Sequence, residues 1–179
     1  MDGRVGEILI SRDKIELRVQ ELAQQISSDI QQDDDLVIVP ILSGAIIFLA
    51  DLIRYLPLRI KIGMLTVSSY PGKTTDSKTA RITQPLATPI ADRNVLVLDD
   101  ILDSGKTLSL VCNELVEQRP KSLKTCVLLR KPTQIAMDFP VDYVGFDIPD
   151  AFVIGYGLDY DDYYRNLPDI AILEQTAAL

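Results

Sequence analysis

Apolar residues recur along the chain in two patterns, one typical of helices and the other of buried strands. After Ser11, which can cap a helix, apolar side chains return every three or four residues, which predicts an amphipathic helix ending near Ile30. Further helices are predicted over residues 46–56 and 106–118. Short apolar runs predict strands at 36–40, 58–67, 94–98 and 122–129, with shorter ones at 141–146 and 152–154.

Strands that alternate with helices along one chain are typical of an α/β fold, in which helices cover both faces of a parallel sheet. Ligands of such sheets bind beyond the carboxyl ends of the strands, near the point where the strand order reverses. Segments 42–44, 69–70 and 99–107 each follow a predicted strand, so we expect them to meet at one edge. The polar, turn-rich stretch from Ser69 to Ala80 is predicted to be a loop or lid.

Composition is typical of a single soluble domain. The chain has 179 residues, of which 47% are hydrophobic and 25% charged. Its net charge of −8 argues against nonspecific binding to nucleic acid or to an anionic membrane. No apolar run is long enough to span a bilayer, and the stretch MDGRVGEILISRDKIE has no uncharged apolar region of the signal-peptide type. Cys112 and Cys126 are interpreted as free buried thiols, so we expect a cytoplasmic protein.

The chain contains no histidine, which excludes Ser-His-Asp and Cys-His nucleophilic catalysis and any His-dependent metal site. The work of a general base therefore falls to a carboxylate, a lysine or a tyrosine.

The stretch VLVLDDILDSGKTL, residues 95–108, combines features of a phosphate site with a run of carboxylates. A strand that turns into a helix here would place the amides of residues 104–107 at the helix N-terminus, where free N–H groups and the helix dipole favour a phosphate monoester. Gly105 would let the backbone approach the ligand closely. Asp99 and Asp100, ahead of this turn, could accept hydrogen bonds from vicinal hydroxyls. The stretch therefore predicts a site for a ribose 5-phosphate.

Two other interpretations of this stretch stay open from the residues alone. It could be a solvated loop with acidic residues ahead of a helix. It also ends like an ATP-binding P-loop, but Asp100 occupies the position of the first glycine of that motif.

The same stretch resembles the phosphoribosyl pyrophosphate (PRPP) signature of the type I phosphoribosyltransferases. The likeness continues through PILSGAIIFLADL, SSYPGKTTDS, LLRKP and VDYVGFDIPDAFVIGYGLDYDDYYRNLPDI, which are similar to the hypoxanthine and hypoxanthine-guanine enzymes, and it covers about residues 7–173. The resemblance implies one domain with a parallel twisted sheet flanked by helices, a small hood and a flexible lid loop. The hood would come partly from the N-terminal segment and about residues 147–179, and the lid from about 69–80.

The activity that the resemblance implies is purine salvage. A 6-oxopurine base, hypoxanthine and guanine among them, would react with PRPP in the presence of Mg²⁺ to give the nucleoside 5′-monophosphate and pyrophosphate. Relatives form homodimers or homotetramers, so the same is expected of this chain.

The resemblance assigns residues to each part of PRPP. Asp99 and Asp100 match the pair that binds the ribose hydroxyls, although the family often has Glu where Asp99 stands, so the reach is shorter here. The 5′-phosphate loop is matched by Ser104, Gly105, Lys106 and Thr107. The pyrophosphate loop, which contains a cis peptide bond in the family, is matched by Leu42, Ser43 and Gly44, with Ser43 replacing a common Lys or Arg. The start of the lid and a pyrophosphate-binding arginine are matched by Ser69, Tyr70 and Arg165.

Four further residues match the purine half of the site. Asp103 matches the candidate acid/base near N7, where a carboxylate could take the imidazole proton; it could also cap the following helix. Lys131 matches the lysine that donates to O6 and so selects 6-oxopurines over adenine. Phe152 matches the aromatic residue that stacks on the base, and Val153 the residue whose backbone reads the base edge.

Asp159 matches a carboxylate that holds Mg²⁺ through water, with Asp99 and Asp100 as the other candidate metal contacts. Two alternatives remain within the same fold. One is a preference for xanthine, because the 2-position of the base is read largely by backbone groups. The other is a nucleotide-sensing regulatory protein that binds RNA, against which the acidic composition and the complete set of catalytic matches argue.

Overall fold

A computed structural model of the chain describes residues 3–30, 35–69 and 80–175. The strands are β1 (Gly3–Ile10), β2 (Leu36–Leu42), β3 (Ile60–Ile62), β4 (Leu65–Ser69), β5 (Ala80–Gln84), β6 (Asn94–Leu102), β7 (Ser122–Arg130), β8 (Tyr143–Asp147), β9 (Val153–Ile154) and β10 (Ile170–Gln175). The helices are α1 (Arg12–Asp29), α2 (Ile46–Tyr55), α3 (Lys106–Val116) and α4 (Gln134–Asp138).

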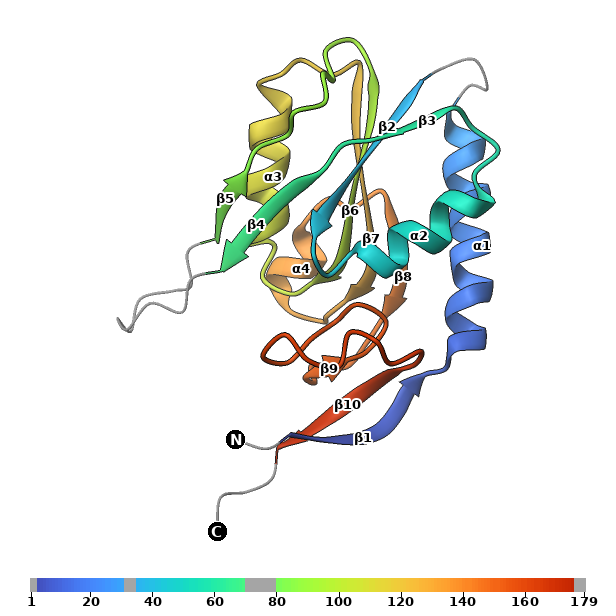
Figure 1. Ribbon diagram of the computed structural model, residues 1–179, viewed down its shortest axis with the longest axis vertical. Helices are drawn as coiled ribbons and strands as arrows, with labels where there is room; N and C mark the ends of the chain where they lie inside the picture. Colours follow the sequence, from blue (N-terminus) through green and yellow to red (C-terminus); the bar gives the residue numbers. More distant parts are fainter. Residues whose placement is uncertain (1–2, 31–34, 70–79, 176–179) are drawn as a thin grey trace.

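Most of the strands form one large sheet with the order β5-β4-β2-β6-β7-β8, and β3 also pairs with β2. All of these pairings are parallel except that of β5, which runs antiparallel to β4. In Figure 1, α1 and α2 lie on one side of this sheet and α3 lies on the other. The predicted α/β class is therefore confirmed, with an antiparallel edge strand that the sequence reading did not include.

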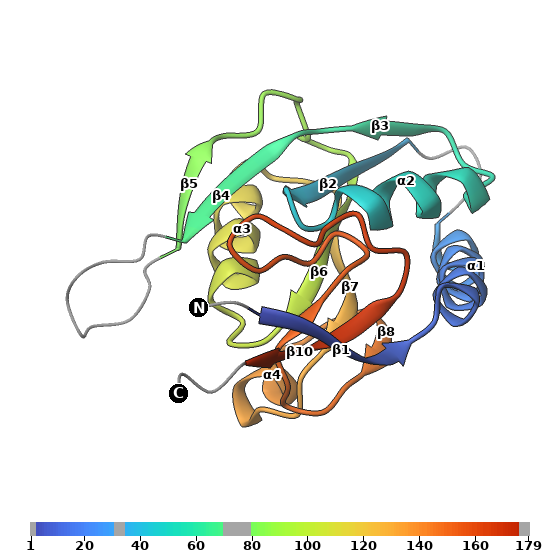
Figure 2. The same cartoon turned by 60° about the horizontal axis from the view of Figure 1, so that its bottom comes forward.

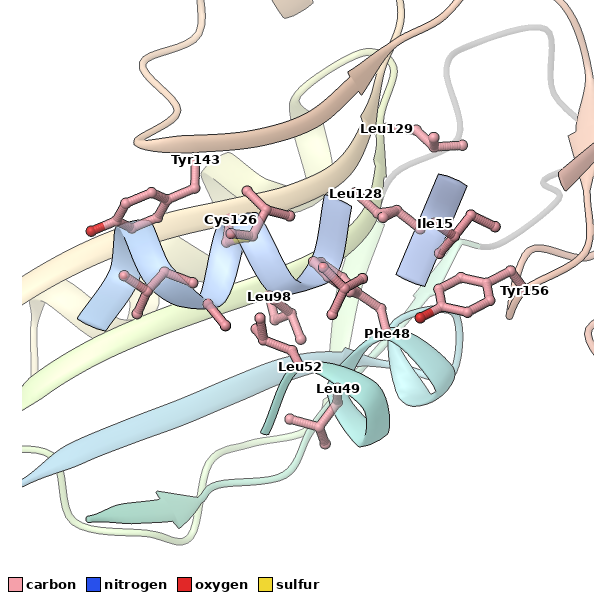
Figure 3. Close-up of a cluster of buried hydrophobic side chains, with 14 of the residues drawn as sticks. Ile15, Phe48, Leu49, Leu52, Leu98, Cys126, Leu128, Leu129, Tyr143 and Tyr156 are labelled. Atoms are coloured by element: carbon pink, nitrogen blue, oxygen red, sulfur yellow. The ribbon is translucent and has the colours of Figure 1, made fainter. Parts of the chain in front are cut away.

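The central strands read as unbroken apolar runs because both of their faces are buried. In β2, Leu36 and Ile38 belong to the cluster that contains the buried residues of α1 and α2, whereas Val37 and Val39 pack with those of α3. Figure 3 shows the first cluster, in which side chains of both helices meet side chains of the sheet.

Several boundaries differ from the predicted ones. The strand predicted over 58–67 is two strands, because the chain bends at Gly63, whose N–H donates to the Ile38 carbonyl at 2.9 Å. Strand β6 continues past Leu98, since its pairing with β7 runs on to Leu102. Asp99 and Asp100 thus lie within the strand and not in the loop after it. The helix predicted over 106–118 ends at Val116, and β1, β5, α4 and β10 were not predicted as elements.

A second, antiparallel sheet with the order β1-β10-β9 joins the two ends of the chain. Figures 1 and 2 show β1 and β10 side by side, beneath the large sheet in the view of Figure 1. The backbone N–H of Arg12 donates to Asp169 Oδ1 at 2.8 Å and so ties the start of α1 to this small sheet. Of the predicted lid, Ser69 ends β4 and Ala80 begins β5, and residues 70–79 lie outside the described part of the chain.

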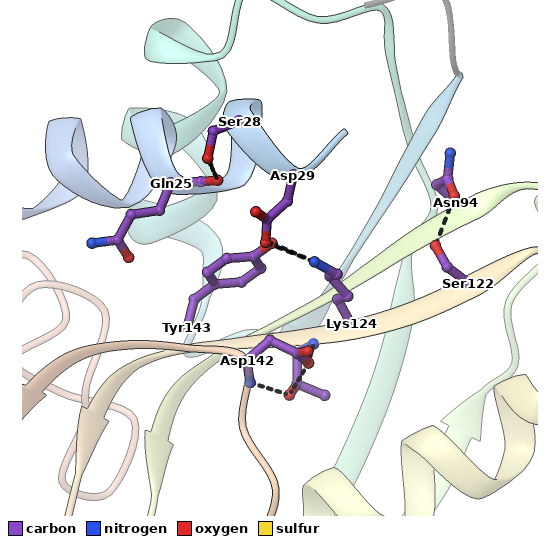
Figure 4. Close-up of polar contacts among 9 residues, drawn as sticks. Gln25, Ser28, Asp29, Asn94, Ser122, Lys124, Asp142 and Tyr143 are labelled. Atoms are coloured by element: carbon purple, nitrogen blue, oxygen red, sulfur yellow. Dashed lines mark hydrogen bonds and ion pairs between the residues drawn. The ribbon is translucent and has the colours of Figure 1, made fainter. Parts of the chain in front are cut away.

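At the opposite end of the large sheet, a polar cluster fixes the last turn of α1 (Figure 4). Asp29 Oδ2 accepts hydrogen bonds from Tyr143 Oη at 2.6 Å and from Lys124 Nζ at 2.7 Å. Cys112 and Cys126 are both free thiols, as predicted, but only Cys126 is buried, and Cys112 is half-buried. No helix within 3–30, 35–69 and 80–175 is long and apolar enough to cross a membrane.

Candidate active site

The order of the strands creates a crevice between β2 and β6. These strands are adjacent and parallel, but the chain leaves β2 toward β4 on one side and β6 toward β7 on the other. At such a switch point the following loops diverge and leave room for a ligand. A cleft of about 770 Å³ lies there, lined by residues 41–44, 66–68, 99–105, 107 and 108, together with Asp159, Asp162 and Arg165. Segments 42–44 and 99–107 were expected to meet at one edge, and residues of both line this cleft; residues 66–68 line it just ahead of the third segment, of which Tyr70 lies outside the described residues.

The loop after β6 presents the N-terminus of α3 to the cleft. Gly105 occupies the N-cap position with a φ of 68°, a left-handed conformation that glycine adopts without strain. No side chain caps this helix, so Asp103 is not a capping residue, contrary to the alternative left open by the sequence. Ser104 and Thr107 line the cleft, whereas the exposed Lys106 side chain is outside its lining. Free amides at this helix end form a site for an anion.

Asp99, which is buried, and Asp100, which is half-buried, form an acidic pair that lines the cleft. The Asp100 amide donates to Asp99 Oδ1 at 3.1 Å, and the Ile101 amide donates to Asp100 Oδ1 at 2.8 Å. Burial raises the pKa of both carboxyl groups, and the charge of Asp100 raises the pKa of Asp99 further. Asp99 therefore takes up a proton at a higher pH than an ordinary aspartate does.

The raised pKa of Asp99 predicts that Asp99→Asn stabilises the ligand-free protein at pH 7.5, with a Tm about 2–4 °C higher. A carboxyl group whose pKa is raised by folding contributes its full stabilisation of the folded state at pH values below 3.8, its pKa in the unfolded chain. This stabilisation is lost as the pH rises through the higher pKa of the folded state. The advantage of the variant should therefore shrink as the pH is lowered. Thermal unfolding from pH 7.5 to 4.5 measures this, with the exposed Asp161→Asn as the control. Equal Tm values for wild type and Asp99→Asn at pH 7.5 would contradict the prediction.

The loop after β2 is packed tightly between β6 and the C-terminal segment. The peptide bond between Leu42 and Ser43 is cis, as the resemblance implies for this loop. A side-chain carbon at Gly44 would overlap Oδ2 of Asp100. A side-chain carbon at Gly157, whose φ is 101°, would overlap the Gly44 carbonyl oxygen. Only residues without a side chain fit this stack, which fixes the loop against the acidic pair.

Arg165 brings a positive charge to the cleft from the segment between β9 and β10. Its Nη1 donates to the Gly157 carbonyl at 2.7 Å, and its Nη2 lies 2.9 Å from Asp159 Oδ1. The Asp162 amide donates to Asp159 Oδ2 at 2.9 Å, which orients that carboxylate. Among the charges that act on Asp100, Arg165 favours the ionised form. A phosphate group in the cleft would meet this guanidinium.

Lys131 lies just after β7, beside the phosphate-binding loop. Its Nζ is 3.3 Å from Asp103 Oδ2, and its backbone N–H donates to the Leu102 carbonyl at 3.0 Å. Thr133 Oγ1 donates to the Asp103 carbonyl at 2.7 Å and so holds the loop in place. An ammonium and a carboxylate are thus placed side by side; Asp103 lines the cleft, whereas Lys131 is outside its lining.

The two other residues matched to the purine site lie on the small-sheet segment. Phe152 is 45% exposed and packs edge-to-face on Tyr160, with ring centroids 5.6 Å apart. Val153 is buried in β9. Neither of them lines the cleft described above. Of the predicted lid residues, Ser69 ends β4 and Tyr70 lies outside the described residues.

The sequence reading missed several residues that line the cleft or contact its polar groups. Thr66 and Ser68 both line it from β4, and Ser68 Oγ is buried without a hydrogen-bond partner among the described residues. Polar residues at alternate positions near the end of a strand were the signal that could have found them. Asp150, Gly157 and Asp162 were also missed, because nothing in their local sequence separates them from an ordinary acidic turn.

The oxygen-rich walls of the cleft suit Mg²⁺, which prefers carboxylate, phosphate and water oxygens. Asp99, Asp100 and Asp159 all line the cleft. Within the described ranges, no three acidic or cysteine side chains gather closely enough to hold a metal ion alone. A Mg²⁺ ion bound here would therefore complete its coordination with substrate oxygens and water.

A phosphate loop and an acidic pair at the switch point of a parallel sheet are the features of a phosphoribosyltransferase. The sequence model of the phosphoribosyl transferase domain family matches residues 7–161, so this chain is a phosphoribosyltransferase in class. The hypoxanthine-guanine phosphoribosyltransferase of Aquifex aeolicus is 41% identical over 172 residues, which cover 96% of this chain and 97% of that protein. The hypoxanthine phosphoribosyltransferase of Haemophilus influenzae is 42% identical over 163 residues, covering 90% and 91%.

Solved structures agree with the sequence relatives. The crystal structure of a hypoxanthine-guanine phosphoribosyltransferase from Bacillus anthracis matches with a TM-score of 0.88 and 36% identity, covering 97% of this chain and 100% of that one. This chain therefore belongs to the hypoxanthine-guanine phosphoribosyltransferase family. The family and the type I fold predicted from the sequence are both confirmed.

Proposed function

We propose that this protein transfers the 5-phosphoribosyl group from PRPP to hypoxanthine and guanine, giving IMP or GMP and pyrophosphate in purine salvage. The observation that carries the proposal is the Lys131–Asp103 pair beside the phosphate loop, with Nζ 3.3 Å from Oδ2. Family membership supports the reaction, and the pair supports the choice of base.

This pair complements one edge of a 6-oxopurine. On that edge O6, an acceptor, lies next to N7. Lys131 can donate to O6 while Asp103 accepts the proton of a base protonated at N7. Adenine presents an amino group in place of O6, so its N–H donors would face the donors of Lys131. The pair should therefore select 6-oxopurines.

The remainder of the cleft fits PRPP. The amides of residues 104–107 would bind the 5′-phosphate, and the pair Asp99–Asp100 would bind the ribose hydroxyls. Pyrophosphate would lie against the loop of residues 42–44, where Arg165 and the unpaired Ser68 hydroxyl supply donors. Because Ser43 carries no charge, Arg165 and the loop amides would replace the cation that is common at that position.

The reaction is one displacement at the anomeric carbon. N9 of the base forms a bond to C1′ as the bond from C1′ to the pyrophosphate oxygen breaks, and the N7 proton passes to Asp103. Asp99, Asp100 and Asp159 are the residues that would hold Mg²⁺ together with PRPP. When bound, the ion neutralises the pyrophosphate and makes it a better leaving group.

Pyrophosphate release from PRPP and Mg²⁺, measured with hypoxanthine, guanine, xanthine, adenine and uracil in separate reactions, tests the proposal. We expect turnover with hypoxanthine and guanine and none with adenine or uracil. Turnover with xanthine alone would contradict the proposed specificity and would show a preference for xanthine instead. Silence with every base, while PRPP still binds, would overturn the enzymatic function in favour of nucleotide sensing. The dimer or tetramer implied by the resemblance stays a prediction, which sedimentation of the protein would check.

A further inference from the structure

Lys131 lies between two carboxylates that belong to different loops. Its Nζ is 3.3 Å from Asp103 Oδ2 and 3.4 Å from Asp150 Oδ1. Asp103 follows β6, Lys131 follows β7, and Asp150 lies between β8 and β9. In the sheet, β7 lies between β6 and β8. The Lys131 side chain is only 12% exposed, whereas that of Asp150 is 71% exposed. A nearly buried ammonium thus has one partner inside the proposed purine site and one outside it.

We propose that Asp150 is a positioning residue for the purine step: it anchors the Lys131 ammonium beside Asp103, so that Lys131 keeps a donor free for O6 of the base. This inference rests on the proposed function, because it takes Lys131 as the group that binds O6. An ammonium has three N–H donors, and the two carboxylates can engage two of them. The remaining donor is the one available to the substrate.

The reaction explains why a second carboxylate is needed. A lysine stem is long and flexible, so an ammonium with a single partner turns toward that partner. Paired with Asp103 alone, the Lys131 ammonium would turn toward that carboxylate, leave its contact with the base and occupy the lone pairs that the N7 proton needs. With Asp150 on its other side, the ammonium is held between two charges and Asp103 keeps lone pairs for the N7 proton.

Backbone hydrogen bonds hold the chain segments that carry these three side chains close to one another. The Lys131 amide donates to Leu102, the residue before Asp103, at 3.0 Å. The Ile148 amide donates to the Arg130 carbonyl at 3.0 Å, and the Ala151 amide donates to the Pro149 carbonyl at 2.8 Å. The segments that precede Asp103 and Asp150 are therefore both hydrogen-bonded to the end of β7. The geometry belongs to the fold and does not depend on a surface contact between mobile side chains alone.

Steady-state kinetics of Asp150→Asn test the proposal. We expect the KM for hypoxanthine to rise roughly three- to fivefold, as for the loss of a partly exposed ion pair. The KM for PRPP and the Tm should not change, because the Asp150 side chain is exposed and its ion pair is to Lys131, a residue of the proposed purine site. Asp150→Glu should restore part of the affinity for hypoxanthine. Asp161→Asn, which removes another exposed aspartate of the C-terminal segment, is the matched control and should behave as wild type.

A double-mutant cycle with Lys131→Met then separates positioning from a general effect of charge. The affinity for IMP, measured by titration calorimetry, needs no turnover and so can be followed in every variant. We expect Asp150→Asn to weaken IMP binding in the wild-type background and to have no effect in the Lys131→Met background. An equal loss in both backgrounds would overturn the proposal, as would an unchanged KM for hypoxanthine in Asp150→Asn. Wild-type protein that turns over no base would instead refute the proposed function.

Discussion

Asp103→Asn is expected to lower kcat with hypoxanthine by about 10²–10⁴-fold, the usual contribution of a positioned general base. An amide cannot accept the N7 proton, so the leaving proton would have to pass to water. The Asp103 side chain is 53% exposed and does not cap α3, so its loss should not destabilise the fold. The KM for PRPP should stay within about twofold, because the contacts that bind the phosphate are backbone amides.

Single-turnover kinetics with saturating PRPP and hypoxanthine measure the chemical step directly. Asp161→Asn again serves as the control for removal of one exposed negative charge. A rate for Asp103→Asn within threefold of wild type would remove Asp103 from the acid/base role. A large rise in the KM for PRPP with kcat unchanged would place this residue in phosphate binding instead.

Gly44→Ala is expected to raise both the KM for PRPP and the inhibition constant for pyrophosphate by about five- to 150-fold, the size of a strain of about one to three kcal/mol. The added carbon would overlap Oδ2 of Asp100, and the loop cannot retreat because Gly157 packs against the Gly44 carbonyl. Either Asp100 would leave the proposed ribose site or the loop amides would leave the proposed pyrophosphate site. The Tm should also fall by several degrees, because the contact is inside the packed floor of the cleft.

Ser43→Ala is the comparison for Gly44→Ala, because it changes the adjacent residue of the same loop without adding an atom to the crowded contact. The Ser43 side chain is exposed, so its loss should raise the KM for PRPP by no more than about threefold. Product inhibition by pyrophosphate and thermal unfolding, measured on both variants, give the two readouts. A wild-type KM for PRPP in Gly44→Ala would mean that the overlap is relieved without moving either ligand-binding group.

The sequence by itself determined the elements whose apolar residues follow a regular local pattern. The three- and four-residue spacing after Ser11 located α1, and the apolar run of residues 36–40 located β2, because a strand buried on both faces has few polar positions. The strand-to-helix turn at residues 104–107, the predicted phosphate loop, was also readable, since a glycine with hydroxyl neighbours at such a turn needs only local backbone geometry.

The tertiary structure alone decided which distant segments meet. Strand β1 pairs with β10, so that Arg4 lies opposite Glu174, and no local pattern names such a partner. The extension of β6 through Asp100 follows from its pairing with β7. Likewise, Asp150 reaches Lys131 because β7 and β8 are neighbours in the sheet. Periodicity in a sequence records which face of an element is buried, but the identity of the covering partner depends on the packing of the whole chain.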